Sequence, residues 1–228
     1  MAYTGLHDVI AQRQDILLGE LLEAGRENLE ARQHGFTPLM MAVGAHLLHE
    51  DRAPPVRKRG DRVVANMLRL LLGAGADVRS VVADWPWAGY TALHMCCECY
   101  PGNASMLVDA GADVNAVSAE GQTPLMCAAP HAFLVKRLLR AGADASAVNM
   151  QGRNALFFAV TAAGVRLLLA AGAAAGQRDA TGVSVARHLQ ALGRVEAAAL
   201  VAASQEMAAS RRRQAETPGL EDGGAGSP

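Results

Sequence analysis

Aromatic side chains are scarce in this chain. They make up 4% of its 228 residues, although hydrophobic residues of all kinds make up 51%. Alanine, leucine, valine and glycine supply most of the bulk of the chain. Small side chains suit closely stacked helices better than they fill a large globular core. The length alone allows one or two ordinary domains or one array of repeats, and the composition favours the array.

The chain also has no excess of charge of either sign. Its 21 Lys and Arg residues are balanced by 22 Asp and Glu residues, so the net charge is −1. No global field draws such a protein to nucleic acid or to a membrane, and we expect neither as a partner. No apolar run is long enough to span a bilayer, and residues 1–9 show no signal peptide. We therefore expect a soluble, cytoplasmic protein, or a nuclear one if the host is eukaryotic.

Motifs of catalysis are missing as well. We find no nucleophile–base pair, no paired carboxylates, no phosphate-binding glycine loop and no His-Glu-x-x-His motif. The glycines recur at regular intervals, which explains them as turn residues and helix caps. The sequence therefore predicts a protein that is not an enzyme and uses no cofactor.

What the chain does contain is a repeated pair of short signatures. The first combines a capping residue with a small or apolar run, and it recurs at Thr4–His7, Thr37–Met40, Thr91–His94, Thr123–Met126 and Asn154–Phe157. The second is a leucine followed by leucine or valine that leads to an Ala-Gly turn, and it recurs at Leu21–Glu27, Leu71–Asp77, Leu107–Asp113, Leu138–Asp144 and Leu168–Ala174. Self-similarity at a fixed period is the mark of a repeat array.

Each pair of signatures predicts two short helices. In the clearest unit, Thr123 suits a helix N-cap and Pro124 suits the first helical position, where its missing N–H leaves no bond unmade. Gly142 can then adopt the left-handed conformation that ends the second helix. The sequence thus predicts a glycine turn followed by two short helices in this unit, and the other units are variations on it.

These residues strongly resemble the ankyrin repeat family, whose unit is a β-turn followed by two antiparallel helices with a T-P-L-H-x-A motif. The resemblance covers roughly residues 1–204 and implies an all-α ankyrin-repeat solenoid of helix-turn-helix units with short β-turn connections. The expected units lie near residues 1–34, 35–88, 89–120, 121–151 and 152–181, with a degenerate cap at 182–204.

Two stretches depart from this pattern. An insertion at 49–62 contains two prolines and a cluster of charges, so we expect an exposed loop. Its basic run Arg57–Arg59 could contact an acidic partner or act as a nuclear-import signal, but Asp51 and Asp61 dilute the charge and favour a solvated loop. After Ser204 the chain turns polar and rich in Gly and Ser, so residues 205–228 are expected to form a disordered tail.

One helix carries a cluster of potential metal ligands. It holds His94, Cys96, Cys97 and Cys99, and His and Cys are good zinc ligands. On a helix, however, these positions point in divergent directions. Buried free cysteine behaves as a small hydrophobe, and the resemblance places His94 in a slot where the imidazole bonds the turn backbone. We expect reduced core thiols and no bound metal, and keep a thiol-redox or metal-binding role as the alternative, with Cys99 the most outward thiol.

The resemblance also implies a binding face. Turn tips and the exposed side of the first helices form a concave surface in this fold, and Trp, Tyr and Arg are enriched at binding hot spots. The residues expected to contact a protein partner are Trp85, Trp87, Tyr90, Glu120, Gln122, His131, Met150 and Arg153. The opposing interpretation is that Trp85 and Trp87 wrap inward and shield the neighbouring turn.

The sequence therefore predicts a monomeric, non-catalytic protein–protein interaction module, acting as adaptor, scaffold or inhibitor. Its partner's identity does not follow from the residues. Asn115 lies in an Asp-Val-Asn context that resembles the site of hydroxylation in some ankyrin repeats.

Overall fold

The computed structural model describes residues 6–12, 14–24, 28–44, 60–83 and 86–216, and in them helices follow one another in pairs without any β-strand. The first helices are α1 (Leu6–Ala11), α3 (Pro38–Gly44), α5 (Ala92–Cys99), α7 (Pro124–Ala128), α9 (Ala155–Phe158) and α11 (Val185–Ala191). The second helices are α2 (Asp15–Glu23), α4 (Gly60–Gly73), α6 (Ala104–Asp109), α8 (Ala132–Arg140), α10 (Ala162–Ala170) and α12 (Val195–Glu216). The predicted all-α solenoid of helix pairs is confirmed.

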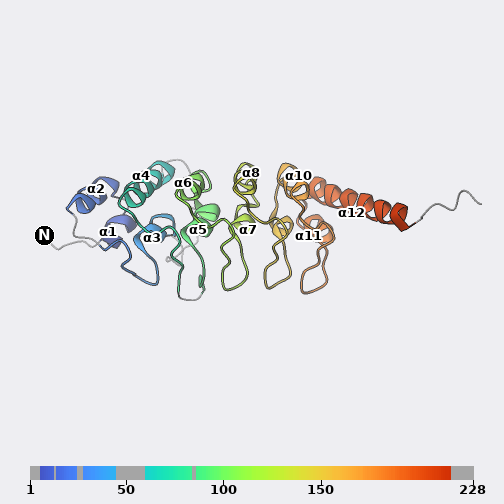
Figure 1. The fold of residues 1–228 in the computed structure, drawn as a ribbon, viewed down its shortest axis with the longest axis horizontal. Helices are drawn as coiled ribbons and strands as arrows, with labels where there is room; N and C mark the ends of the chain where they lie inside the picture. Colours follow the sequence, from blue (N-terminus) through green and yellow to red (C-terminus); the bar gives the residue numbers. More distant parts are fainter. Residues whose placement is uncertain (1–5, 13, 25–27, 45–59, 84–85, 217–228) are drawn as a thin grey trace, which may run out of the picture.

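The pairs stack side by side into an elongated array with two helical layers (Figure 1). The first helices form one layer, in which α3 packs on α1 and α5, and α7 packs on α5 and α9. The second helices form the other layer, where α8 packs on α6 and α10. The loops that connect successive pairs all project to the same side of the array, beyond the first-helix layer (Figure 1).

Side-chain caps begin the first helices where the sequence signatures place them. The Thr123 hydroxyl accepts a hydrogen bond from the backbone N–H of Met126, and the Asn154 side chain accepts one from the N–H of Leu156. Each cap satisfies a backbone donor that would otherwise lack a partner at the helix N-terminus. The same chemistry, repeated along the chain, fixes where these pairs start.

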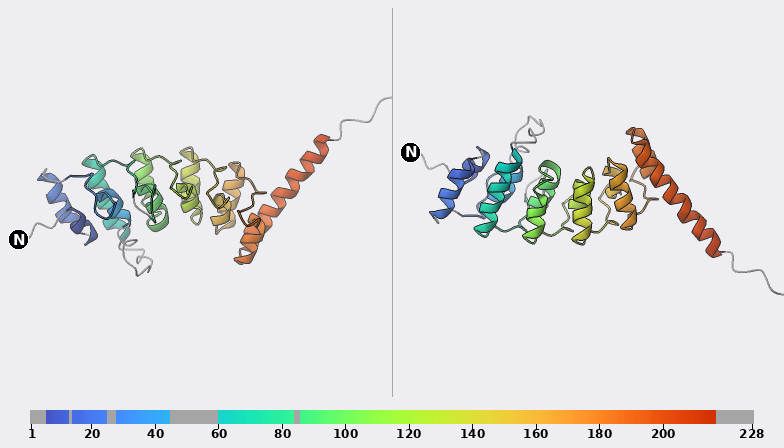
Figure 2. Two further views of the ribbon diagram at one scale, coloured as in Figure 1. Left: turned by 90° about the horizontal axis from the view of Figure 1, so that it is seen from below. Right: turned by 90° about the horizontal axis from the view of Figure 1, so that it is seen from above.

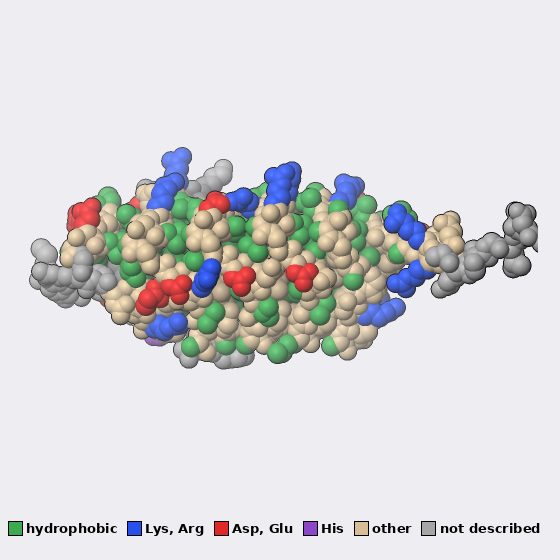
Figure 3. All heavy atoms as spheres, in the orientation of Figure 1, with side chains coloured by type: hydrophobic (Ala, Val, Ile, Leu, Met, Phe, Trp, Pro, Cys, Tyr) green, Lys and Arg blue, Asp and Glu red, His purple; other side chains and the backbone are tan. Residues whose placement is uncertain are grey.

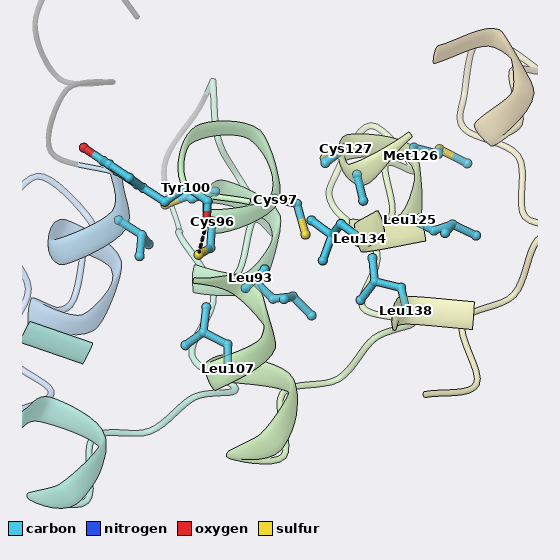
Figure 4. Packing of buried hydrophobic residues seen from close by; sticks show 14 of the residues in the cluster. Leu93, Cys96, Cys97, Tyr100, Leu107, Leu125, Met126, Cys127, Leu134 and Leu138 are labelled. Atoms are coloured by element: carbon cyan, nitrogen blue, oxygen red, sulfur yellow. Dashed lines mark hydrogen bonds between the residues drawn. The ribbon is translucent and has the colours of Figure 1, made fainter. Parts of the chain in front are cut away.

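Leucines at matching positions of each helix build one continuous core. Leu93, Leu107, Leu125 and Leu138 are fully or almost fully buried between neighbouring pairs (Figure 4). Each pair thus buries its apolar face against the next pair, and no unit could form a core of this kind alone.

The C-terminal helix is longer than the sequence predicted. Its start packs against α10 and α11 through Ala197, Ala198 and Val201, and the rest projects away from the array (Figure 2). Residues 205–216, predicted to be disordered, continue this helix. The reason is their content of Ala, Glu, Gln, Met and Arg without Gly or Pro, a composition with high helix propensity. The remainder of that predicted tail, 217–228, lies outside the described residues.

The predicted loop at 49–62 is described only at its end. Helix α4 starts at Gly60, so the last three residues of that segment are helical. Residues 45–59, including the basic run Arg57–Arg59, lie outside the described part of the chain.

No helix in the described ranges combines the length and the hydrophobicity that a bilayer crossing requires.

Candidate functional site

The turn tips are held in place by glycine and by each other. Gly89, Gly121 and Gly152 have φ values of 78°, 77° and 72°, a left-handed conformation that glycine adopts readily. At Gly89 and Gly121, a Cβ atom would also lie 3.0 Å or less from backbone atoms of the next turn. Glycine is therefore required at these two positions both for conformation and for space.

Backbone hydrogen bonds link successive tips into a ladder. The N–H of Ala119 donates to the carbonyl of Ala88 at 2.9 Å, and the N–H of Met150 donates to that of Glu120 at 3.0 Å. A third bond, from Ala180 N–H to Gln151 O, measures 2.7 Å. Since these bonds need no particular side chain, the tips keep their spacing whatever residues they carry.

A shallow groove of roughly 480 Å³ runs along the exposed side of α7, α9 and α11. Apolar and aromatic side chains form much of its surface, and cationic ones border it. The groove residues are Glu98, Met126, Cys127, Pro130, His131, Arg153, Phe157, Phe158, Val160, His188, Leu192 and Arg194. It brings together two of the residues predicted to bind a partner, His131 and Arg153.

The arginines of this groove are already anchored. Arg153 forms a salt bridge of 3.0 Å with Asp179, and its guanidinium lies 5.8 Å from the centre of the Phe157 ring. Arg194 donates a hydrogen bond of 2.8 Å to the carbonyl of Ala159. Because internal partners hold both cations, the groove offers a partner an apolar surface within a fixed polar border.

Two titratable groups in the groove have shifted pKa values. Burial lowers the pKa of His188, whose ring lies 5.4 Å from that of Phe157, and the positive charges of Arg153 and Arg194 lower it further. Glu98 is exposed as a residue, but partial desolvation of its carboxyl raises its pKa, while hydrogen bonds with Cys127 and Tyr90 act in the opposite direction.

Of the predicted aromatic patch, Tyr90 faces inward. Tyr90 is only 8% exposed and contacts Trp87 edge-on, with ring centres 5.2 Å apart. Its ring also lies 4.9 Å from that of His94, and burial raises the pKa of its phenol. Trp87 is half-buried against the core, and Trp85 lies outside the described residues. Tyr90 is therefore a packing residue, because the neighbouring turn and helix cover it.

His94 bonds the turn backbone, as the resemblance implied. Its Nδ1 atom accepts a hydrogen bond from the N–H of Thr91 at 3.2 Å, which assigns the ring proton to Nε2. Nε2 in turn lies 3.1 Å from the carbonyl of Gln122 in the next unit, to which it donates. Burial lowers the pKa of His94 to about 4, because a second ring proton would face a backbone donor in a site away from water.

This neutral imidazole predicts that stability depends on pH. The folded pKa of about 4 lies below the usual 6.5, so the unfolded chain binds more protons between these values. The contribution of neutral His94 to the free energy of unfolding should therefore be fully present above pH 6.5. It should fall by about 3 kcal/mol as the pH drops to 4. His94→Gln removes the titrating group, so urea unfolding from pH 4 to 8 should show a flatter profile for this variant. Parallel profiles for the two proteins would refute the assignment.

The cysteine helix shows no arrangement suited to metal or redox chemistry among its described residues. Cys96 and Cys97 point to opposite sides of α5, and the Cys96 thiol donates to the carbonyl of Tyr100 at 3.3 Å (Figure 4). Burial raises the pKa of Cys97, and it raises that of Cys99 to about 12. A reactive thiol has a lowered pKa. Within the described ranges, no three His, Cys, Asp or Glu side chains are grouped so that they could hold a metal ion.

Asn115 has a structural role between two units. Its Nδ2 atom donates a hydrogen bond of 3.0 Å to the carbonyl of Gly142, and its Oδ1 atom accepts one of 2.8 Å from the N–H of Asp144. Both ends of the amide thus brace the turn that follows α8.

Three further predicted residues flank the turn glycines. Met150 is 74% exposed and Glu120 is exposed, so both tips are open to a partner. Gln122 is half-buried, and its backbone carbonyl is the acceptor for His94.

The sequence analysis missed most of the groove, above all Phe157, Phe158, Val160, His188, Leu192 and Arg194. The sequence signal for this groove is the pair of phenylalanines in the first helix of its unit, at positions where the preceding unit holds Met126 and Cys127.

Two larger hollows have a different character. One, of roughly 630 Å³, lies among the turns from Arg79 to Ala141, and the other, of roughly 740 Å³, lies beside α12. Small side chains and backbone form most of both, and neither has an aromatic residue among the described residues that line it. The groove along α7, α9 and α11 is the better candidate, because aromatic and apolar side chains converge in it.

Comparisons with known proteins agree with this architecture. The profile of a family described as ankyrin repeats (3 copies) matches residues 61–144 and 102–179. An ankyrin repeat domain from Acinetobacter baumannii AYE, solved as a crystal structure, is 25% identical to this chain with a TM-score of 0.67. That match covers 88% of this chain and 97% of the bacterial domain. The comparison with curated proteins gave no match.

Proposed function

Because this chain belongs to the ankyrin repeat family, we propose that it is a non-catalytic module that holds a protein partner along the α7–α11 groove and the neighbouring turn tips. Ankyrin repeats are generally protein–protein interaction modules. An adaptor, a scaffold and an inhibitor would all use this mode of binding.

The groove itself is the observation that supports the proposal. Leu192 is 51% exposed and Val160 is 44% exposed, and both lie beside the half-buried Phe158. None of these side chains needs its exposed surface for the stack. With the arginines held by internal partners, the groove suits an apolar anchor residue of a partner, which would bury this surface and displace water.

The ladder of turn tips explains how such binding would stay favourable. A surface that is already ordered loses little conformational entropy when a partner docks. Met150 presents an exposed apolar side chain at one turn tip, and Glu120 presents a charge at another. Charges at the border of an interface select partners and set their register more than they add affinity.

Charge introduced into the groove should abolish partner capture. In the variant Val160→Asp/Leu192→Asp, two carboxylates replace apolar surface that is partly open to water, so the fold should survive while an apolar anchor is rejected. We expect at least about a tenfold loss of affinity, measured by titrating the partner that the wild-type protein retains from a lysate of its host.

Met207→Asp is the matched control, since Met207 is 59% exposed on α12, outside the groove. Capture by wild type and by this control, with loss in the groove variant, supports the proposal. Equal capture by all three proteins contradicts it. The Trp87→Ala/Tyr90→Ala double variant is unsuitable for this test, because the buried Tyr90 ring contributes to packing.

A further inference from the structure

A second groove, of roughly 340 Å³, lies in the other helical layer between α6 and α8. Pro101, Gly102 and Leu134 line it, together with the exposed Phe133 and the basic side chains of α8. A Cβ atom added to Gly102 would meet no other atom within 4 Å, so this side of the groove is open.

Helix α8 has one face buried in the core and one face exposed to solvent. Its inner face buries Leu134, Val135 and Leu138 in the core. Its outer face carries Phe133, which is 60% exposed, and then basic residues three, four and seven positions later, at the spacing of one helix ridge: Lys136, Arg137 and Arg140. In the space-filling view, basic side chains gather over α8 at the upper edge of the molecule (Figure 3).

The fold does not require this outer ridge. When the units are aligned on the Ala-Gly turn after each second helix, the slots of Phe133 and Arg140 hold neither an aromatic nor a basic residue in the flanking pairs. The equivalent residues are Gly102 and Asp109 in the preceding pair and Ala163 and Ala170 in the following pair. The slot of Lys136 holds Ser105 in the preceding pair and Arg166 in the following pair, so Phe133 and Arg140 together distinguish the α7–α8 unit from its neighbours.

The ridge carries unbalanced positive charge. Arg137 pairs with Asp109, which neutralises the acidic residue of α6 at this border. Lys136 and Arg140 are exposed, and neither forms an ion pair within the described ranges. The groove thus combines one exposed aromatic side chain, further apolar lining and two cations that no described acid pairs with. In the α7–α11 groove, by contrast, internal partners hold both arginines.

We propose that the α6–α8 groove binds an acidic segment of a protein partner, at a site separate from the α7–α11 groove. A bulky apolar side chain of that segment packs against Phe133 over Gly102, and flanking Asp or Glu residues pair with Lys136 and Arg140. Arg140 can hold a carboxylate with two parallel hydrogen bonds. Two faces of one array can then hold two partners at once.

The first test uses a fluorescein-labelled peptide, Gly-Asp-Glu-Leu-Glu-Asp-Gly, titrated with the full chain in a fluorescence anisotropy assay. Two control peptides replace either the acids by Asn and Gln or the leucine by Gly. We expect the acidic leucine peptide to bind about tenfold more tightly than either control, because each control lacks one half of the recognition. Equal affinities for the three peptides, or no binding of any, would overturn the proposal.

Substitutions in the α6–α8 groove then test whether the peptide binds there. Lys136→Glu/Arg140→Glu and Phe133→Ser should each weaken peptide binding about tenfold. Arg187→Glu/Arg211→Glu, at two exposed arginines elsewhere, makes the same change in net charge and should leave binding unchanged. Thermal unfolding checks that each variant is folded. An equal loss of peptide affinity in both charge-reversed proteins would mean that binding depends on the net charge of the protein alone. Competition by a phosphate salt, but not by the matching chloride, would instead reveal a general anion site, and either result refutes the proposal.

Discussion

Replacing Leu156 by alanine is expected to destabilise the array by about 2–5 kcal/mol. Leu156 is fully buried in α9, a helix of four residues that packs against α7, α10 and α11. Its removal leaves a cavity between units that a one-turn helix is too short to close by bending. In a protein of this size, that loss lowers the melting temperature by roughly 4–20 °C.

Leu192→Ala is the matched control for this prediction. The same side chain is removed there from a position that is 51% exposed, so the change in stability should stay within about 0.5 kcal/mol. Urea unfolding followed by circular dichroism measures both free energies. Similar losses in the two variants would show that α9 is not packed as described.

Gly89→Ala is expected to destabilise the protein by about 2–6 kcal/mol. Alanine would have to adopt the φ of 78°, which costs about 1–3 kcal/mol for a residue with a side chain. Its Cβ would also lie 2.8 Å from the backbone nitrogen of Ala119 and 2.9 Å from the Cα of Ser118. The backbone of one of the two turns must therefore shift, which costs about a further 1–3 kcal/mol of stability. This shift also strains the hydrogen bond from the N–H of Ala119 to the carbonyl of Ala88.

Gly182→Ala separates the two contributions. Gly182 has a φ of 81°, but a Cβ there meets no atom within 4 Å. The free energy of unfolding of this variant should fall only by the cost of a positive φ for alanine, about 1–3 kcal/mol. The difference between the two free energies of unfolding isolates the close approach of neighbouring turns, and a difference of zero would mean that the turns can move apart freely.

The repeated helix pairs could be predicted because their signals are local. A capping Thr or Asn and a glycine after the helix each act within a few residues, so they can be read without knowing the fold. Thr123, Asn154 and Gly142 act at the positions predicted for them. The structural role of His94 followed from the resemblance, since its partner Gln122 lies in the next unit.

The orientation of aromatic side chains could not be predicted in this way. Tyr90 and Met150 both flank a turn glycine in the sequence, yet Tyr90 is 8% exposed and Met150 is 74% exposed. The difference arises from contacts with other residues, because Trp87 and His94 enclose the phenol ring. Phe157 and Phe158 pose the same problem, since a helix of four residues shows too little periodicity to assign its faces.

The bonds between turn tips also have an evolutionary consequence. They join backbone atoms, so the spacing of the tips is inherited with the fold and not with the residues that face a partner. Positions such as Glu120 and Met150 can therefore mutate with little effect on stability while they change what is bound. Natural variants of this protein should diverge fastest at these tips and stay constant at Gly89 and Gly121, so that new specificities arise on an unchanged frame.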